Sequence, residues 1–479
     1  MEKLIFWVLG ISLLVRSAGL ADKFDLDLLF RAYDIRGVYG VHLTEVFAKV
    51  LGRALGDFLG CGSRVVVGRD VRLSGETLKN AVASGLAFNC EVLDVGVVPT
   101  PVLYFAINHL GVDAGVMVTA SHNPPEWNGF KLFKPGGCIY GKEMAQIKEA
   151  AKRMNQEKPP VKHGRVSEYS GILEDYCRFA LKRVSLSRRL KVVCDTANGV
   201  CGLIVGRLFR SLGCNIRVLN EKPDGRFPAH LPEPKEETLE DLKRLVVDLG
   251  ADFGVGFDGD GDRAVFVDDK GRIVPGDLAL MIFAEEVLRK HGGGKVVYEL
   301  SCSMAVEEFI RAHGGHPIVE RVGHVYIMDR VLKEKALLGG EKSSHFYFQE
   351  CGGMDDAVFA SLKMAEILSI KGENLSEIVD KLPKYPSIHE KNIPCPDHLK
   401  FKVVERLKEE FKEMGMKLLD IDGVKILDEE GWILLRPSNT EPLIRVSGEA
   451  KTANKLERLY RLVEEKLEKV MEKTAKQTD

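Results

Sequence analysis

Short apolar runs alternate with longer amphipathic stretches along most of the chain. Eight runs rich in β-branched residues predict strands, and they cover residues 64–67, 91–95, 114–118, 191–194, 215–219, 252–257, 264–267 and 295–298. Apolar residues spaced three and four apart predict helices between these strands, among them residues 74–88, 203–212 and 278–290. The alternation of strand and helix from about residue 24 to residue 380 predicts layered α/β domains.

The pattern changes after about residue 385. The remainder predicts a helix, three strands and a charged helix, at residues 397–414, 423–427, 432–436, 443–447 and 452–473. This order is typical of a smaller α+β domain. The pattern breaks at the polar segment 157–162, at the turn 268–271 and in the segment 383–396, which contains four prolines.

These breaks predict an N-terminal segment and four domains. The 479 residues are roughly three times a typical domain of about 150, so several cores are expected. Three similar α/β domains precede the smaller α+β domain. The predicted bounds are 1–22 for the N-terminal segment and 23–162, 163–268, 269–382 and 383–479 for domains 1 to 4.

Composition and charge narrow the class of protein. Apolar residues make up 45% and charged residues 29%, as in an ordinary globular enzyme. The 68 basic residues nearly balance the 70 acidic ones, and the absence of a long basic tract argues against nucleic acid as a partner. The ten cysteines form no C-x-x-C pair and no zinc-spaced cluster, so reduced thiols are expected. The sequence gives no signal for an oligomeric state.

The N-terminal segment resembles a signal peptide, because Lys3 precedes an apolar run at residues 4–15 and small residues lead to Ala21. The run is too short for a membrane-spanning helix, which needs about 20 residues. The alternative is an extension upstream of the true start, or a poorly ordered tail. We prefer this alternative because the chain after Asp22 has the pattern of a cytoplasmic enzyme, and we expect no stable membrane partner.

Residues 258–263, with the sequence DGDGDR, give the strongest chemical signal. Alternate side chains of an extended chain face the same way, and the glycines let the loop curl until Asp258, Asp260 and Asp262 converge. A hard divalent cation would hold these carboxylates together. The segment lacks the Gly and Glu positions of an EF-hand, and the overlapping glycine motif precedes a strand instead of the helix of a dinucleotide site. The structural alternative is a solvated acidic turn.

A second motif, Thr-Ala-Ser-His-Asn-Pro at residues 119–124, follows an apolar strand. Ser121 beside a cation can accept a phosphoryl group, because the cation stabilises both the alkoxide and the transferring group. Alone, the Ser-His-Asn sequence is equally typical of a turn that hydrogen-bonds its own backbone. The chain has no G-x-S-x-G motif, which argues against an acyl-transfer serine hydrolase.

Two later segments are rich in groups that bind phosphate and sugar hydroxyls. Residues 436–442 and Arg445 combine hydroxyl, amide and guanidinium donors, which a phosphate dianion requires. Residues 340–345 offer a carboxylate and hydroxyls that suit a sugar. The structural alternatives are a turn with solvated arginines for the first segment and an ordinary strand end for the second.

Segments 119–124, 258–263, 340–345 and 436–442 occur in the order that characterises the α-D-phosphohexomutase superfamily, which the chain resembles over about residues 24 to 470. Residues 31–37 and 118–131 look most like the phosphomannomutase/phosphoglucomutase group and differ from phosphoglucosamine mutases. The resemblance implies four domains around a central cleft, in an enzyme that moves phosphate between the C1 and C6 oxygens of a hexose.

The resemblance also implies a role for each motif. Ser121 would be the phosphoserine and would bind one Mg²⁺ together with Asp258, Asp260 and Asp262. Hexose 1,6-bisphosphate would be the intermediate and activator, turning over in the cleft before its other phosphate returns to the serine. Candidates for acid-base or charge-stabilising roles are Lys131, Arg36 and His324. Residues expected to bind the sugar phosphate are Tyr33, Arg263, Glu341, Ser343, His345, Arg436, Ser438, Asn439, Thr440 and Arg445, of which those after residue 435 would hold the phosphate that is not reacting.

The chain departs from the family pattern at substrate contacts. Ser301 stands where hexose enzymes often have a lysine, and Lys342 replaces the usual methionine. Ser344 replaces a glycine, and Val322 and Val325 replace hydroxyl residues. The phosphoserine and metal motifs are complete, so the reaction class is better defined than the sugar.

The choice of sugar and two other functions stay open at this point. Glu341 and Ser343 resemble residues that bind the 3- and 4-hydroxyls, which glucose and mannose share, so both sugars are expected. The alternative within the superfamily is a phosphoglucosamine mutase. Alternatives of another class are a phosphatase and a non-mutase protein that binds sugar phosphates.

Overall fold

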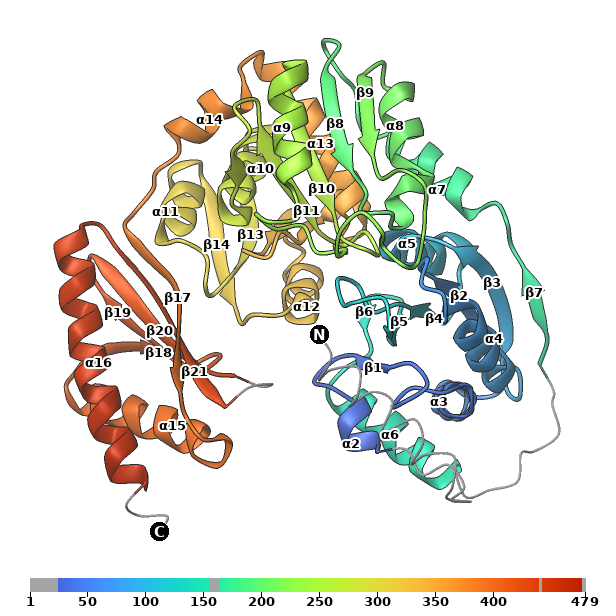
Figure 1. Cartoon of the computed structure of the whole chain (residues 1–479), viewed down its shortest axis with the longest axis horizontal. Coiled ribbons are helices and arrows are strands. Elements are labelled where there is room, and N and C mark those ends of the chain that lie inside the picture. The colour runs from blue at the N-terminus through green and yellow to red at the C-terminus, as the bar shows by residue number, and fades with distance from the viewer. Residues whose placement is uncertain (1–24, 155–163, 439–441, 476–479) are drawn as a thin grey trace, which may run out of the picture.

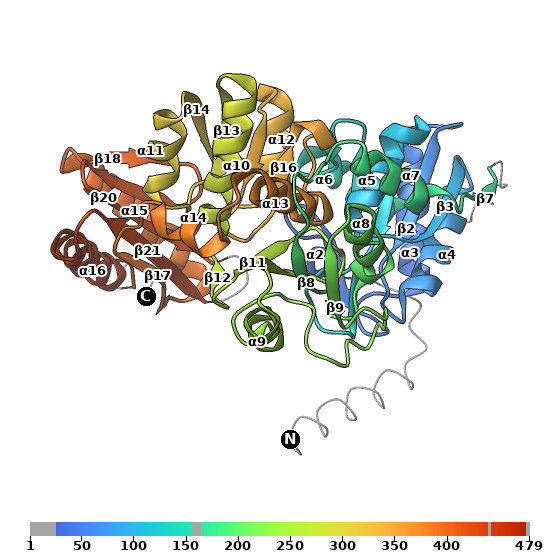
Figure 2. The ribbon, with the colours of Figure 1, turned by 90° about the horizontal axis from the view of Figure 1, so that it is seen from above.

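The computed structural model describes residues 25–154, 164–438 and 442–475 (Figure 1). Four sheets follow one another along the chain, and we call the units that contain them domains 1 to 4. They form an arc with domain 1 at one end and domain 4 at the other (Figures 1 and 2). The predicted architecture of three layered α/β domains and a C-terminal α+β domain is confirmed.

Domain 1 is a mixed sheet with helices on both faces. Its strands are β1 (Ile35–Val38), β2 (Arg64–Arg69), β3 (Glu91–Val97), β4 (Ala114–Val118), β5 (Trp127–Lys134), β6 (Gly137–Cys138) and β7 (Val166–Glu168), and its helices are α2 (Leu26–Leu29), α3 (Glu45–Leu59), α4 (Gly75–Leu86), α5 (Thr100–Leu110) and α6 (Lys142–Met154). The strand order is β1-β5-β4-β2-β3-β7, and β6 pairs with β5. Val65 and Val67 of β2 pack with α3, α4 and α6, whereas Val66 lies in the core that contains α5, as the alternation of a strand requires.

Domain 2 places the acidic segment at a hairpin. Its helices are α7 (Ile172–Leu181), α8 (Val205–Ser211) and α9 (Glu240–Leu249), and its strands are β8 (Lys191–Asp195), β9 (Asn215–Leu219), β10 (Phe253–Phe257), β11 (Ala264–Asp268) and β12 (Ile273–Val274). The order is β12-β11-β10-β8-β9. Strands β10 and β11 are antiparallel, with Phe257 opposite Ala264, so residues 258–263 form the connecting loop.

Domain 3 presents residues 341–345 in the same way. Its strands are β13 (Gly294–Glu299), β14 (Gly315–Glu320), β15 (Leu338–Gly340) and β16 (Phe346–Phe348), and its helices are α10 (Gly276–His291), α11 (Met304–Ala312), α12 (His324–Glu334), α13 (Ala357–Lys371) and α14 (Leu375–Lys381). The order is β14-β13-β15-β16, and the loop joins the antiparallel strands β15 and β16.

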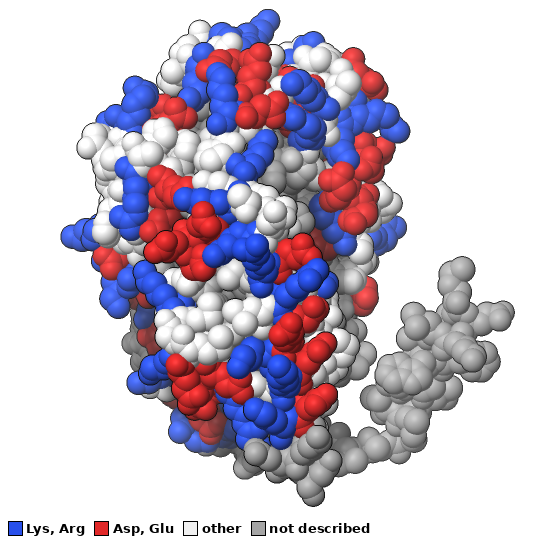
Figure 3. Space-filling model, turned by 90° about the vertical axis from the view of Figure 1, so that its left-hand side faces the viewer, with Lys and Arg blue, Asp and Glu red and all other residues white. Residues whose placement is uncertain are grey.

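Domain 4 is an antiparallel sheet covered by two helices. Its elements are β17 (Ser387–Pro394), α15 (Asp397–Glu413), β18 (Lys417–Leu419), β19 (Val424–Asp428), β20 (Gly431–Pro437), β21 (Leu443–Ala450) and α16 (Ala453–Ala475), with the strand order β17-β21-β20-β19-β18. Basic and acidic side chains are interspersed over the described residues on the side of the molecule shown in Figure 3. Within α16, Arg461 forms an ion pair with Glu457, one helical turn away.

Domains 1 to 3 share one hydrophobic core, whereas domain 4 has its own. The shared cluster contains buried residues from Val66 in β2 to Leu382 after α14. A separate cluster joins the sheet of domain 4 to α15 and α16. The two parts meet through a small apolar contact of Trp432 and Leu434 with Leu300 of domain 3.

The structure differs from the sequence prediction at three segments. The proline-rich break at 383–396 contains strand β17, which is an edge strand and can therefore tolerate prolines at its ends. Strand β7 adds residues 166–168 to the sheet of domain 1, beyond the predicted bound at 162. Strand β12 adds residues 273–274 to the sheet of domain 2, beyond the predicted bound at 268.

All ten cysteines are free of disulfide bonds, as the sequence predicts. Within the described residues, no helix combines the length and the apolar character that crossing a bilayer demands. The signal-like segment 1–22 lies outside the described residues.

Candidate active site

The acidic loop between β10 and β11 brings its three carboxylates together, as predicted. Asp258, Asp260 and Asp262 are at most 1% exposed, and each offers an oxygen within 4.8 Å of the others. Asp258 Oδ1 accepts hydrogen bonds from three successive backbone N–H groups, those of Gly261, Asp262 and Arg263, at 3.0 to 3.2 Å. These bonds curl the loop, and Gly261 supplies the positive φ of 79° that the curl needs.

Ser121 approaches this loop from domain 1, on the connection between β4 and β5. Its hydroxyl donates a 2.7 Å hydrogen bond to Asp258 Oδ2 and lies 3.1 Å from the Nδ1 atom of His122. Its backbone has a φ of 50°, a left-handed conformation that costs free energy for a residue with a side chain. The strained turn points the hydroxyl at a carboxylate of another domain, which is the arrangement a metal-assisted nucleophile needs.

A buried guanidinium that the sequence did not single out holds the Ser121 turn. Arg72 follows β2, and its Nη2 atom donates to the backbone oxygens of Ser121 at 2.8 Å and Asn123 at 2.6 Å. Its Nε atom pairs with Asp70 at 3.1 Å, and Asp70 in turn accepts a bond from the Thr119 hydroxyl at 2.8 Å. The turn is therefore fixed from both ends by a charged network inside domain 1.

Lys131 on β5 lies between two of the carboxylates. Its ammonium is 2.8 Å from Asp260 Oδ2 and 2.5 Å from Asp262 Oδ2, and Thr100 also donates to Asp260 at 2.7 Å. Burial disfavours the charge of Lys131, but the two carboxylates outweigh it and raise its pKa. Burial and the neighbouring carboxylates raise the pKa of Asp258. The pKa of Asp258, which lies beside like charges, is thus raised, whereas Lys131 helps to lower the pKa values of Asp260 and Asp262.

The acidic loop fits a bound divalent cation. The Oδ1 atoms of Asp260 and Asp262 are buried without a hydrogen-bond partner among the described residues. Unpartnered buried carboxylate oxygens are costly, and carboxylate oxygens are the ligands of hard cations such as Mg²⁺. The loop is therefore a metal-binding site, with Ser121 Oγ directly beside it.

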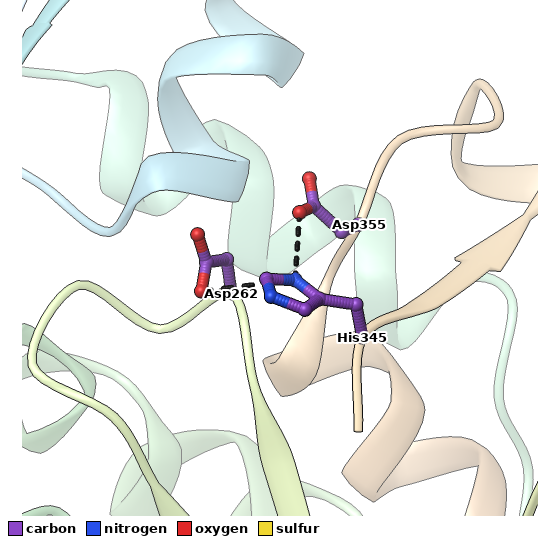
Figure 4. Close-up of side chains that lie close together, drawn as sticks. All are labelled: Asp262, His345 and Asp355. Carbon is purple, nitrogen blue, oxygen red and sulfur yellow. Dashed lines mark hydrogen bonds and ion pairs between the residues drawn. The ribbon is translucent and has the colours of Figure 1, made fainter. Parts of the chain in front are cut away.

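Two histidines of domain 3 lie close to a buried carboxylate, Asp355, that the sequence also did not single out. Figure 4 shows Asp355 with one of them, His345, and with Asp262. Asp355 Oδ2 is 2.9 Å from the Nδ1 atom of His345 and 3.6 Å from that of His324. The Nε atom of Arg263 donates to His345 Nε2 at 2.9 Å. Because an arginine side chain only donates hydrogen bonds, the Nε2 atom of His345 must be the acceptor. His345 therefore carries its hydrogen on Nδ1 and donates a hydrogen bond from there to Asp355.

The pKa values agree with this chain of hydrogen bonds. Burial lowers the pKa of His345, which keeps the ring neutral. Burial also disfavours the charge of Asp355, but the nearby ring of His324 and the hydrogen bond from His345 outweigh it and lower its pKa. Asp355 is therefore an ionised anchor for His345, Arg263 and His324, all of which the sequence predicts as site residues.

A pocket of about 660 Å³ joins these groups. Of the predicted residues, it is lined by Tyr33, Arg36, Ser121, Lys131, Asp262, Arg263, His324 and His345. Arg36 donates to Asn123 Oδ1 at 2.6 Å and pairs with Asp34 at 2.6 Å. Burial, together with Arg263 and Arg36, lowers the pKa of His122 to about 2, so this histidine is neutral.

Glu341 and Ser343 lie on the loop between β15 and β16. Glu341 is 2% exposed, and its carboxylate accepts hydrogen bonds from the Tyr347 hydroxyl and, at 3.5 Å, from that of Ser343. Burial raises the pKa of Glu341, and Glu299 nearby adds to the effect. A smaller cavity of about 370 Å³ is lined by Ser343 and Arg263, and Arg263 also lines the 660 Å³ pocket, whereas Glu341 and Ser343 do not.

Of the predicted phosphate-binding residues of domain 4, the three that the structure describes, Arg436, Ser438 and Arg445, do not line the 660 Å³ pocket. Arg436 at the end of β20 pairs with Asp422 at 3.0 Å, and Arg445 on β21 pairs with Glu390 at 3.0 Å. Ser438 is 4% exposed. Asn439 and Thr440 lie outside the described residues.

Comparison with known proteins gives a consistent result along the chain. Family models of phosphoglucomutase/phosphomannomutase match in order, as α/β/α domain I at residues 27–158, domain II at 174–271, domain III at 275–385 and the C-terminal domain at 390–466. A phosphoglucomutase/phosphomannomutase of Thermococcus kodakarensis is 38% identical over 92% of this chain and 99% of its own. A probable phosphoglucosamine mutase of Methanothermobacter thermautotrophicus is 37% identical over 92% and 98%.

A solved structure also matches over nearly the whole length. It is that of a phosphoglucomutase/phosphomannomutase family protein from Burkholderia thailandensis, which is 34% identical and superposes with a TM-score of 0.85. The match covers 95% of this chain and 98% of the other. Both the order of the domains and their arrangement are therefore similar to those of known structures.

Proposed function

This chain belongs to the phosphoglucomutase/phosphomannomutase family of the α-D-phosphohexomutase superfamily, a family of isomerases, and from this membership we propose that it interconverts the 1-phosphates and 6-phosphates of mannose and glucose through a phosphoserine at Ser121. One observation carries the proposal. The Ser121 hydroxyl lies 2.7 Å from Asp258 within a buried cluster of three carboxylates. A nucleophile beside a metal-binding site is what phosphoryl storage requires.

Asp258, Asp260 and Asp262 would hold Mg²⁺, which supplies charge neutralisation for the phosphoryl group. Arg72 keeps the Ser121 turn in place, so that Ser121 Oγ can hold a phosphoryl group and give it up to a sugar hydroxyl. In that transfer the bond from phosphorus to the serine oxygen breaks and a bond to the sugar oxygen forms, while the sugar hydroxyl loses its proton. Lys131, Arg36 and His324 are our candidates to accept that proton or to balance the developing charge.

The pocket supports binding of a sugar between domains 1 and 3. Glu341 and Ser343 offer a carboxylate and a hydroxyl for the 3- and 4-hydroxyl groups. Asp355 fixes His345, which in turn fixes Arg263 at the mouth of the acidic loop. Glucose and mannose share the 3- and 4-hydroxyl groups that Glu341 and Ser343 would bind, so both sugars should be substrates. The ring of Tyr33 lies edge-on to that of His324, with ring centroids 5.2 Å apart, and lines the pocket on its domain 1 side.

Domain 4 would bind the phosphate that is not being transferred, through Arg436, Ser438, Asn439, Thr440 and Arg445. One reaction site and one phosphate-holding site are then sufficient, because hexose 1,6-bisphosphate can present either of its phosphates to Ser121 after it reverses its orientation in the cleft. We also expect this bisphosphate to activate the enzyme by phosphorylating Ser121. A cytoplasmic location is part of the same proposal.

The test is incubation with glucose 1-phosphate and catalytic hexose 1,6-bisphosphate, followed by separate assays of glucose 6-phosphate and free phosphate. Glucose 6-phosphate as the main product supports the mutase, free phosphate supports a phosphatase, and neither product supports a binding protein. A second candidate, a phosphoglucosamine mutase, is favoured by the relatives of that name. It replaces the hexose assignment if kcat/KM for glucosamine 1-phosphate exceeds that for glucose 1-phosphate and mannose 1-phosphate by more than about tenfold, a difference of about 1.4 kcal/mol.

A further inference from the structure

Lys342 is a cation without a partner in the loop between Glu341 and Ser343. Within the described parts of the chain, its ammonium takes part in no ion pair and no hydrogen bond. The side chain is partly exposed and therefore accessible to a ligand. An ammonium that neither forms an ion pair nor lies fully in solvent can bind an anion without first losing a protein contact.

Lys342 lines two cavities. The cavity of about 370 Å³ also contains Arg263 and Ser343, which belong to the predicted sugar site. The other, of about 160 Å³, lies between domains 3 and 4 and is lined by Ser301 and Trp432 among others. Lys342 is therefore placed where the sugar loop meets the domain that we propose to hold the second phosphate.

The carboxylates that line the interdomain cavity are already engaged. Glu449 of β21 accepts a 2.7 Å hydrogen bond from the backbone N–H of Met304, at the start of α11. Asp277 accepts a 3.2 Å bond from the backbone N–H of Ser303. Both carboxylates thus accept hydrogen bonds from the N-terminal end of α11, and neither forms an ion pair with Lys342.

The other lysines at these cavities have carboxylate partners. Lys384 pairs with Asp380 at 3.7 Å beside the interdomain cavity, and Lys235 pairs with Glu233 at 3.3 Å beside the larger one. Among the lysines that line the two cavities, Lys342 alone has no such partner in the described residues.

Lys342 and a predicted phosphate ligand of domain 4 face the same buried residue. Glu299, at the end of β13, is 2% exposed and accepts a hydrogen bond from the Ser301 hydroxyl. The charges of Arg436 and Lys342 both act on it from nearby, although burial still raises its pKa. Lys342 of domain 3 and Arg436 of domain 4 therefore both act on Glu299, to which the Ser301 hydroxyl is bonded.

We propose that Lys342 binds the phosphate group of the sugar phosphate that is not being transferred, together with Arg436 of domain 4. This inference rests on the proposed function and adds a ligand from domain 3 to its holding site. A phosphate dianion suits an ammonium as a compact point charge, and hydrogen bonds between two charged groups are among the strongest in proteins. Lys342 thereby takes over the role of a cation that the chain lacks at residue 301.

The experiment measures KM, kcat and thermal unfolding for Lys342→Met, Lys342→Arg and the matched control Lys384→Met. Lys342→Met should raise KM for glucose 1-phosphate and mannose 1-phosphate together, by about tenfold, with kcat changed less than about twofold. Lys342→Arg should keep most of the affinity, and Lys384→Met should keep all of it. In the Lys342→Met background, Ser301→Lys should restore a cation to the same cavity and lower KM again.

Two results would overturn the inference. One is a KM for Lys342→Met within about twofold of the unmodified enzyme. The other is a drop in unfolding temperature and kcat that Glu299→Gln reverses, because Lys342 would then only balance Glu299. If the unmodified chain shows no mutase activity, the proposed function fails on its own, and calorimetric binding of glucose 6-phosphate to the same variants decides the inference by the same tenfold criterion.

Discussion

Ser121 and Asp258 belong to different domains, yet domains 1 and 2 share one hydrophobic core and the two side chains are in direct contact. Arg436 and Arg445 lie on a domain with a core of its own, and their ion pairs are a quarter to two-fifths exposed. Groups that take part in bond breaking need fixed positions within a fraction of an ångström, and a shared core provides them. Groups that only bind a phosphate need a positive charge and a long side chain, and arginines in partly exposed ion pairs have both.

The contrast also appears in the cost of each arrangement. The reaction end keeps Ser121 in a left-handed backbone conformation and places three carboxylates together, both of which oppose folding. Arg72 and Lys131 offset these costs by bonds to the turn and to the carboxylates. In domain 4, the ion pairs of Arg436 with Asp422 and of Arg445 with Glu390 are both partly exposed. Substitutions should therefore affect rate at one end and affinity at the other.

Ser121→Ala is expected to have the largest effect and to abolish turnover, because Ser121 has the one hydroxyl, among the described residues, that both bonds to the acidic loop and lines the 660 Å³ pocket. The coupled assay for glucose 6-phosphate measures this loss, with the buried Ser361→Ala of α13 as the matched control. Incubation of the unmodified enzyme with hexose 1,6-bisphosphate should add one phosphate, which mass spectrometry locates. A phosphate on a residue other than Ser121 would contradict the assignment.

Removal of the metal should lower kcat at least tenfold, a change of about 1.4 kcal/mol in the barrier. Phosphoryl transfer depends on charge neutralisation, and the three carboxylates repel one another without a cation. Chelation followed by titration with Mg²⁺ measures the effect, and Asp260→Asn should reproduce it. Asp241→Asn is the control, since Asp241 is an exposed residue paired with Arg244. More than about a tenth of the activity after chelation would rule out a catalytic metal.

Asp355→Asn should lower kcat/KM by about tenfold, because the amide can still accept from His345 but no longer carries the charge that orients both histidines. Asp355→Ala should lower it further, and the difference between the two variants measures positioning apart from folding. The unfolding temperature of each is measured alongside. Equal kcat/KM for the two variants and the unmodified enzyme would show that the histidines need no anchor.

Arg445→Gln should have the smallest effect, an increase in KM of about three- to tenfold with kcat and the unfolding temperature nearly unchanged. The ion pair with Glu390 is partly exposed, and such pairs contribute about 0.2 to 1 kcal/mol to folding. Glu390→Gln is the control and should leave KM the same or lower it, since it frees Arg445 from a competing carboxylate. A tenfold loss of kcat in Arg445→Gln would contradict the proposed difference between the reaction site around Ser121 and the phosphate-binding residues of domain 4.

The sequence predicted those parts of the site that depend on local order. Residues 258–263 had to curl because glycines alternate with carboxylates, and the structure confirms that the carboxylates converge. Strands β4 and β9 were predicted to the residue, β4 from a buried apolar run and β9 from β-branched residues that alternate with polar ones. Strand β5 was not predicted as a strand, since Asn128, Gly129 and Lys131 interrupt its apolar pattern.

The sequence could not identify partners that only the tertiary structure brings together. Arg72 and Asp355 carry no motif of their own near Ser121 or His324, and their roles follow from contacts with loops far along the chain. A buried charged residue is a recognisable signal only after burial is known. The same holds for Lys342, which is an ordinary loop lysine in the sequence and an unpartnered cation at a domain boundary in the fold.

The short connection between α14 and β17 has a consequence for how the protein comes apart. Residues 382–386 are the one covalent link between the shared core and domain 4, and the apolar contact through Leu300 is small. A protease that cuts this link would leave two pieces, each with its own buried cluster. The larger piece would keep Ser121 and the acidic loop, which we propose to carry the phosphoryl group, and would lack the domain 4 residues that we propose to hold the second phosphate.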